Sequence, residues 1–243
     1  MKVLAVNGSP RRERSNTRRL LDPLLEGAES AGAEVERVYL TDLDVRPCKG
    51  CMSCWVATPG RCVQQDDMAA LLEKMRSAQA IVIGFPLYIF GVPARVQAML
   101  ERLLPTVEPW LVREGGRTTH PTRDAVWKAH WLAIANCGFP EQVHFDAVER
   151  KFAYLGVPLL AMSAGEFLRT MEREPALAGP LEALRSALRQ AGESLARQGR
   201  VPEELLSRLR RPIIEYAGIT PDQYAEGGNE SFHRALRIAE RKR

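Results

Sequence analysis

Four of the five cysteines lie close together in the spacing C-x2-C-x2-C-x7-C, at Cys48, Cys51, Cys54 and Cys62. Two residues between successive thiolates allow one tight loop to direct three sulfurs toward a single point, as in loops that bind iron–sulfur clusters. Zinc is the weaker metal candidate, because all-cysteine zinc sites usually consist of two separated C-x2-C pairs. The run therefore leaves three alternatives open: an iron–sulfur cluster, zinc, or reduced and packed thiols.

The surrounding sequence alternates short apolar runs with amphipathic stretches, which is typical of an α/β fold with a parallel sheet between two layers of helices. We expect strands at 3–6, 34–40, 80–84, 131–136 and 157–164, and helices at 16–31, 66–77, 93–104, 141–155 and 179–198. Asp66 and Asp67 are expected to cap the helix after the cysteine run. This pattern fits two doubly wound arrangements, of which we expect the flavodoxin-like sheet of five parallel strands in the order 2-1-3-4-5. Its ligand crevice lies at the carboxyl ends of strands 1, 3 and 4.

The loop after the first strand (8–17) carries hydroxyl and amide side chains and three arginines at the start of a helix. It has neither the GxGxxG fingerprint of a dinucleotide site nor the GK[ST] of a nucleoside triphosphate loop. The free N–H groups and the positive dipole end of a helix N-terminus suit a phosphate monoester. We therefore expect this loop to bind phosphate, the alternative being a capped surface turn.

The loops after the third and fourth strands carry aromatic residues. The loop at 84–94 is apolar and stiffened by prolines, so it would make a wall for a flat ring. Alternatively, Phe85, Leu87 and Phe90 pack beneath the sheet. The loop at 136–140 has a glycine that permits close backbone approach and a phenylalanine that would complete the ring site. We expect its Cys137 to be a buried residue rather than a nucleophile, because no histidine lies near it in sequence.

Three segments in their order carry a family resemblance: GSPRRERSNT, the cysteine run followed by DDM, and GFPLYIFGVPARVQAMLERLL. Together they resemble the NADPH-dependent FMN reductase family, and within it the iron–sulfur flavoproteins. The resemblance covers roughly residues 1–165. It implies a flavodoxin-like fold and FMN as the cofactor.

The resemblance also implies roles for particular residues. The FMN phosphate would be held by Ser9, Arg11, Ser15, Asn16 and Thr17. The isoalloxazine ring and ribityl chain would face Pro86, Leu87, Tyr88 and Ile89. The site would be closed by Asn136, Gly138 and Phe139. A 4Fe–4S cluster would be ligated by Cys48, Cys51, Cys54 and Cys62.

The expected function is that of an FMN-dependent oxidoreductase that takes electrons from NADPH or NADH and passes them to a quinone, a flavin or a similar small acceptor. The ring does the chemistry in such a protein, so we predict no catalytic side chain. One alternative is an iron–sulfur flavoprotein that relays electrons from a ferredoxin-type protein donor without nicotinamide turnover. Another is a flavin-binding regulatory module with little turnover.

We expect one flavodoxin-like domain at 1–198, containing the cysteine loop (48–62) and an insertion (105–126), and a helical extension at 199–243 with two or three short amphipathic helices. Apolar residues in the insertion and extension favour a homodimer or homotetramer, namely Trp110, Leu111, Ile213, Ile214 and Tyr216.

Composition limits the partners and the location. The net charge is +4, and the arginines of the last fifty residues alternate with glutamates, so we expect no nucleic-acid partner. No apolar stretch approaches the ~20 residues of a membrane span. The chain enters a short strand directly, without a secretory leader, so a cytoplasmic protein is expected.

Overall fold

The central sheet has the predicted architecture. The computed structural model describes residues 1–240. Five strands pair in parallel, namely β1 (Lys2–Asn7), β2 (Glu34–Tyr39), β3 (Ala80–Pro86), β6 (His130–Asn136) and β7 (Leu159–Met162). Their order is β2-β1-β3-β6-β7, which confirms the flavodoxin-like 2-1-3-4-5 prediction. The three central strands are almost entirely buried because helices cover both faces of a parallel sheet.

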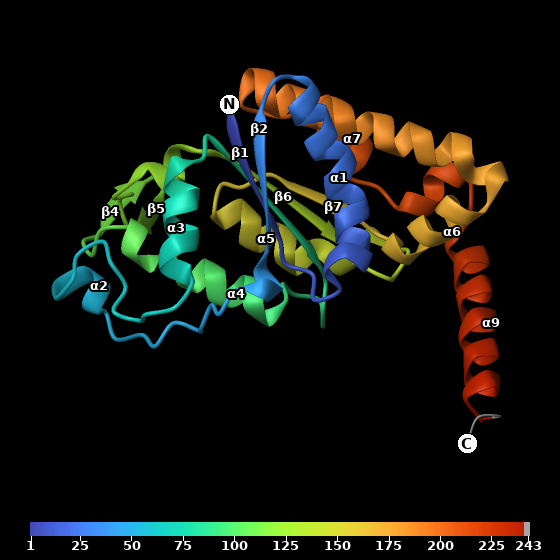
Figure 1. Cartoon of the computed structure of the whole chain (residues 1–243), viewed down its shortest axis with the longest axis horizontal. Helices are drawn as coiled ribbons and strands as arrows, with labels where there is room; N and C mark the ends of the chain where they lie inside the picture. The colour runs from blue at the N-terminus through green and yellow to red at the C-terminus, as the bar shows by residue number, and fades with distance from the viewer. Residues whose placement is uncertain (241–243) are drawn as a thin grey trace.

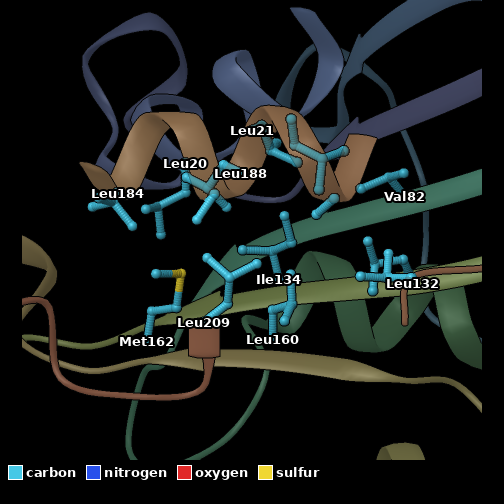
Figure 2. Close-up of a cluster of buried hydrophobic side chains, with 14 of the residues drawn as sticks. Leu20, Leu21, Val82, Leu132, Ile134, Leu160, Met162, Leu184, Leu188 and Leu209 are labelled. Atoms are coloured by element: carbon cyan, nitrogen blue, oxygen red, sulfur yellow. The ribbon is translucent and has the colours of Figure 1, made fainter. Parts of the chain in front are cut away.

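Helices cover the two faces of the sheet in separate groups (Figure 1). On one face lie α1 (Asn16–Ser30) and α7 (Ala178–Gln198), together with α6 (Leu168–Arg173) and α8 (Glu203–Leu209). On the other lie α3 (Met68–Ser77), α4 (Ala94–Glu101) and α5 (Asp146–Tyr154). Figure 2 shows the first group's core, where leucines of α1 and α7 meet Val82, Ile134 and Leu160 of the sheet.

Two glycines bring the backbones of α1 and α7 into contact. A Cβ built on Gly27 would lie 2.0 Å from the Arg189 carbonyl oxygen, and one built on Gly192 would lie 1.7 Å from that of Leu24. No side chain fits at either point, since real Cβ atoms do not approach backbone so closely. The crossing fixes α1, and with it the loop that precedes α1.

The insertion at 105–126 contains a β-hairpin. Its strands β4 (Val112–Glu114) and β5 (Arg117–Thr119) are antiparallel, and Gly115 and Gly116 join them with φ angles of 55° and 77°. Positive φ at both turn positions is the type I′ geometry that glycine favours. The insertion packs beside the short α2 (Ser53–Val56) of the cysteine loop, because the Trp55 ring lies 4.8 Å from that of His120, measured between centroids. Trp55 also donates its Nε1–H to the carbonyl of Leu104, just before the insertion, at 3.2 Å. We call the cysteine loop and the insertion together the cysteine lobe.

The C-terminal extension differs from its prediction. It contains α8, a 3-10 turn (Ile213–Ala217) and α9 (Pro221–Glu240), a 20-residue helix where only short ones were expected. Ile213 and Ile214 are buried in the main core, so they are not the exposed apolar surface that we predicted. Beyond its first turns α9 extends away from the body, at the opposite end from α2 (Figure 1). Its last three predicted residues, 241–243, lie outside the described part of the chain. No helix within 1–240 has the length and apolar character to cross a membrane.

Candidate functional site

The register of the sheet brings the three predicted loops to one edge. Asn7 at the end of β1 pairs with Gly84 of β3, and Pro86 at the end of β3 pairs with Asn136 of β6. A hydrogen bond of 2.9 Å from the Asn136 amide to the Thr17 hydroxyl ties the third loop to the first. We call the loops after β1, β3 and β6 the first, second and third tips.

The first tip is built around Ser15, the N-cap of α1. Its Oγ accepts the Arg18 N–H at 3.0 Å and donates to the Arg12 carbonyl at 2.7 Å. The N–H groups of Asn16 and Thr17 lie in the first helical turn, where no intrahelical acceptor exists. Within residues 1–240 the buried Asn16 Oδ1 has no hydrogen-bond partner. Since the oxygen and nitrogen of an amide are assigned by their partners, Asn16 can equally present its NH2 group to a ligand. Ser9 and Thr17 are buried beside it.

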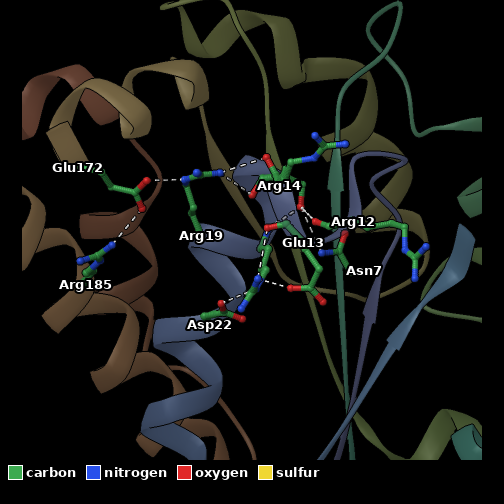
Figure 3. A network of polar contacts seen from close by, with 10 residues as sticks. Asn7, Arg12, Glu13, Arg14, Arg19, Asp22, Glu172 and Arg185 are labelled. Atoms are coloured by element: carbon green, nitrogen blue, oxygen red, sulfur yellow. Dashed lines mark hydrogen bonds and ion pairs between the residues drawn. The ribbon is translucent and has the colours of Figure 1, made fainter.

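Two of the three arginines of the first tip pair with carboxylates. Arg11 donates to Glu166 at 2.9 Å, and Arg12 donates to Asp42 at 2.7 Å. Figure 3 shows Arg19 held between Glu172 and the backbone of the same loop. The structure therefore brings together Ser9, Ser15, Asn16 and Thr17, whereas the side chain of Arg11 is engaged by Glu166.

The second tip is a tight and strained turn. Tyr88 and Gly91 exchange two backbone hydrogen bonds of 3.1 Å. Between them Ile89 and Phe90 have φ angles of 47° and 57°. Such left-handed geometry costs roughly 1–2 kcal/mol for each non-glycine residue. Ile89 is nevertheless 93% exposed, so the turn displays an apolar side chain that packs on almost nothing. Phe85 is buried, which confirms the packing alternative for that residue.

The third tip meets the second through aromatic rings. Phe139 lies 6.0 Å from Phe90 in a stacked arrangement and 4.4 Å from His144, measured between ring centroids. Phe90 and Phe139 are each about half exposed, so these rings form a wall that faces outward. Cys137 is buried, and burial raises the pKa of its thiol to about 11. It is therefore a neutral packed group at ordinary pH, as expected.

The four clustered cysteines line one cavity of about 20 Å³, together with Lys49 and Arg102. Hydrogen bonds from Ser53 lower the pKa of the exposed Cys51, whereas burial raises that of Cys54. Within residues 1–240 no three His, Cys, Asp or Glu side chains converge in a metal-binding arrangement. The thiols thus share a cavity but must move closer together to ligate one group.

A buried ion pair anchors the base of the cysteine lobe. Arg102 donates to the two carboxylate oxygens of Asp66 at 2.6 and 2.8 Å, and the two side chains are 1% and 0% exposed. Arg102 also donates to the Arg46 carbonyl at 2.9 Å, just before the cysteine loop. In the described residues its buried Nε–H has no acceptor. A donor of this kind beside four thiols fits an anionic sulfur group in the cavity.

Sequence reasoning missed four residues of these sites: Arg102, its partner Asp66, Glu166 and Tyr224. Asp66 was expected only as a helix cap, and it does accept the Met68 N–H at 3.2 Å, but its main partner is Arg102. Glu166 and Tyr224 reach the tips from far along the chain, Tyr224 by donating to the Gly138 carbonyl at 2.8 Å. No local pattern identifies such partners, although a buried arginine always requires one.

Comparisons with known proteins match mainly the N-terminal half of the chain at the level of sequence. The profile of the NADPH-dependent FMN reductase family matches residues 1–120. An iron–sulfur flavoprotein of Archaeoglobus fulgidus is 42% identical over 102 residues, which are 42% of this chain and 48% of that protein. The chain spans about half the length of the curated relatives it matches.

Solved structures share the fold at low sequence identity. A NAD(P)H:quinone oxidoreductase from Methanothermobacter marburgensis superposes with a TM-score of 0.58 at 15% identity, over 82% of this chain and 98% of that one. An FMN-dependent NADH-azoreductase from Bacillus anthracis, solved in complex with FMN, gives a TM-score of 0.56 at 17% identity, over 81% and 99% of the two chains.

Proposed function

Residues 1–120 belong to the NADPH-dependent FMN reductase family, and we propose that the protein is an FMN-dependent oxidoreductase that passes electrons from NADPH or NADH to a quinone, a flavin or a similar acceptor. The observation that carries the proposal is the meeting of two unlike surfaces at one sheet edge. The first tip presents the N–H groups of a helix N-terminus and a buried Asn16 amide whose Oδ1 has no partner in the described residues, and the second and third tips present an exposed aromatic wall. A flavin mononucleotide has a phosphate and a flat ring that match these two surfaces.

The first tip would bind the phosphate. The hydroxyl of Ser9, the Asn16 amide and the N–H groups of Asn16 and Thr17 lie where α1 begins, and the helix dipole favours an anion there. Ser15 acts differently, because its hydroxyl is already used to cap α1 and to close the loop onto Arg12. It would keep the donors in place rather than supply one itself.

The second and third tips would hold the ring. Pro86, Leu87, Tyr88 and Ile89 would form one wall, and Asn136, Gly138 and Phe139 would close the site. When bound, FMN supplies the redox chemistry by accepting hydride from the nicotinamide and delivering electrons onward. The chain's own residues orient the ring, and the exposure of Tyr88 and Phe139 leaves room for a second flat molecule beside it.

Rapid mixing tests this proposal. The purified protein is saturated with FMN and mixed anaerobically with NADPH or NADH while flavin absorbance is followed. We expect the flavin band to bleach with one nicotinamide and the colour to return when a quinone is added. A protein that retains FAD but not FMN, or that binds no flavin at saturating concentration, would refute the assignment.

A second candidate is an iron–sulfur flavoprotein that relays electrons from a ferredoxin-type protein donor. It is supported by the four cysteines that line one cavity beside the buried Arg102. Anaerobic reconstitution with iron and sulfide tests the loop, with wild type, Cys54→Ala and Cys137→Ala compared. Both substitutions remove a buried thiol, but only Cys54 lies in the loop. Iron uptake by wild type and Cys137→Ala, with loss in Cys54→Ala, supports the cluster. Equal uptake, or none, makes the loop structural.

The self-association that the sequence favours remains part of the proposal. Trp110 and Leu111 in the cysteine lobe are exposed, and Tyr154 and Leu155 at the end of α5 add a second apolar surface. Exposed aromatic residues of this kind are common at subunit interfaces. We expect a dimer or tetramer in sedimentation at micromolar concentration, and a monomer would contradict the expectation.

A further inference from the structure

The extension reaches the third tip with one side chain. The Tyr224 hydroxyl, on the first turn of α9, donates to the Gly138 carbonyl at 2.8 Å across 86 residues of sequence. Phe167 packs against the Tyr224 ring edge-on, with centroids 6.3 Å apart. Tyr224 lies outside residues 1–120, which match the family. The contact therefore joins the C-terminal extension to the third tip outside the part of the chain that matches the family profile.

Three consecutive carbonyls of the third tip are fixed by donors from the C-terminal side. The Cys137 carbonyl accepts the Gly165 N–H at 2.7 Å, and the Phe139 carbonyl accepts the Ala164 N–H at 2.7 Å. The Gly138 carbonyl between them accepts the Tyr224 hydroxyl at 2.8 Å, and the Phe139 carbonyl also accepts the Cys137 thiol at 3.4 Å. Ala164 has a φ of 55°, so this donor segment keeps a strained geometry to make its contacts.

Among Cys137, Gly138 and Phe139, Gly138 has the backbone that can rotate most easily. It has no Cβ, and nothing lies within 4 Å of the place where a Cβ would be. Glycine adopts many backbone conformations, so packing alone does not select one for the peptide between Gly138 and Phe139. The hydrogen bond from Tyr224 does select one.

The orientation of this peptide decides what the third tip offers to a ligand. In a trans peptide the carbonyl of one residue and the N–H of the next point in opposite directions. Because the Gly138 carbonyl points at Tyr224, the Phe139 N–H points away from α9 and is available to a bound ring. Burial raises the pKa of Tyr224 to about 12, so the phenol stays a donor at neutral pH.

We propose that Tyr224 is a positioning residue for bound FMN: its hydroxyl locks the peptide between Gly138 and Phe139 so that the Phe139 N–H is presented to the flavin ring. This inference rests on the proposed function. It makes the C-terminal extension a part of the cofactor site, although α9 itself supplies no atom to the ring.

Tyr224→Phe tests the inference, with Tyr216→Phe as the matched control. Both remove one phenolic hydroxyl from the extension, and the Tyr216 hydroxyl donates to the Arg208 carbonyl at 3.4 Å, in another part of the extension. FMN dissociation constants are measured by titrating the apoprotein, and the reduction potential and visible circular dichroism are measured at saturating FMN. Thermal unfolding of each apoprotein reports the purely structural effect.

We expect Tyr224→Phe to weaken FMN binding about fivefold, the effect of losing one hydrogen bond, and to change both spectrum and potential. Tyr216→Phe should stay within about twofold of wild type with an unchanged spectrum. Equal effects of the two substitutions, or an unchanged flavin in Tyr224→Phe, would overturn the role of Tyr224 alone. Wild type that binds no FMN would overturn the proposed function, and the inference with it.

Discussion

Buried polar side chains of the described chain gather in two regions, and the two are organised differently. At the tips they are Asn7, Ser9, Ser15, Asn16, Thr17, Asn136 and Ser163; in the cysteine lobe or directly beside it they are Gln64, Arg102 and Thr106. The buried side chains of the tips are held by neutral hydrogen bonds, and within residues 1–240 the amide oxygen of Asn16 has no partner. The lobe depends on one buried ion pair at its base, and its thiols do not converge. The tips are thus preorganised for a ligand. In the lobe, by contrast, the Asp66–Arg102 pair fixes the base, while the four thiols must still move closer together to bind one group.

The largest expected effect is a loss of stability when the buried ion pair at the base of the cysteine lobe is broken. Asp66→Asn removes the charge that compensates Arg102 but keeps the shape of the side chain. An uncompensated buried charge costs about 3–5 kcal/mol of unfolding free energy, measured by chemical denaturation.

The double variant Asp66→Asn/Arg102→Met is the control, because it removes both charges. It should recover most of the lost stability, since apolar groups often replace a buried pair without cost. Exposed ion pairs contribute below about 1 kcal/mol to the free energy of unfolding. If Asp66→Asn lowers that free energy by no more than this, the pair does not anchor the lobe.

The next effect concerns the tips. Ser15→Asp and Ser15→Asn both provide good N-caps, so α1 should form in each. The aspartate places a carboxylate beside the phosphate, and like charges about 4 Å apart repel by roughly 4 kcal/mol at an effective dielectric constant of ~20. We expect FMN affinity to fall at least about 100-fold in Ser15→Asp and less than about tenfold in Ser15→Asn. Equal losses in a fluorescence titration would place the phosphate elsewhere.

Acid should weaken the lobe selectively. Burial alone would raise the pKa of Asp66, but hydrogen bonds from Arg102 and from the Arg46 N–H outweigh it and hold the pKa below the usual 3.8. The folded state therefore favours the carboxylate, which stabilises the protein above pH 3.8, and this contribution is lost as the pH falls through the lower folded value. Relative to the double variant, wild type should lose stability only below pH 3.8. A constant difference down to pH 3 would contradict the lowered pKa.

The smallest effect tests the strain in the second tip. Asn tolerates the left-handed region better than a β-branched residue, so Ile89→Asn should raise the unfolding free energy by about 1 kcal/mol. The side chain is 93% exposed, so little packing is lost. Val143→Asn, at another exposed apolar position without positive φ, should give no gain. If the two substitutions behave alike, the turn is not strained.

The sheet and its tips were predictable because local patterns determine them. Apolar runs bounded by loops located all five central strands, and the βα alternation limited their order to two doubly wound arrangements, of which the expected one is observed. The position of Ser15 at the start of an amphipathic stretch marked the beginning of α1. The hairpin in the insertion has a local signal as well, since Gly115 and Gly116 lie between two short extended segments, but our prediction for 105–126 was only an insertion.

The remaining features depend on contacts between distant residues. Asp66 meets Arg102 across 36 positions, and Tyr224 meets Gly138 across 86. Local patterns of charge and hydrophobic periodicity do not predict which residues pair over such distances in the sequence. The length of α9 was underestimated for another reason: Gly227 and Gly228 lower helix propensity in its middle, yet the helix continues through them.

The glycine crossing of α1 and α7 has a consequence for how the molecule opens. Gly27 and Gly192 leave no space in which one helix can slide or tilt without the other. The two helices should therefore exchange their amide hydrogens with solvent at one common rate, as a single cooperative unit. That unit begins at the first tip and ends at the start of the extension, so local opening should not separate the first tip from the C-terminal elements. Release of a tightly held cofactor would then require motion of the second and third tips, while the first remains in place.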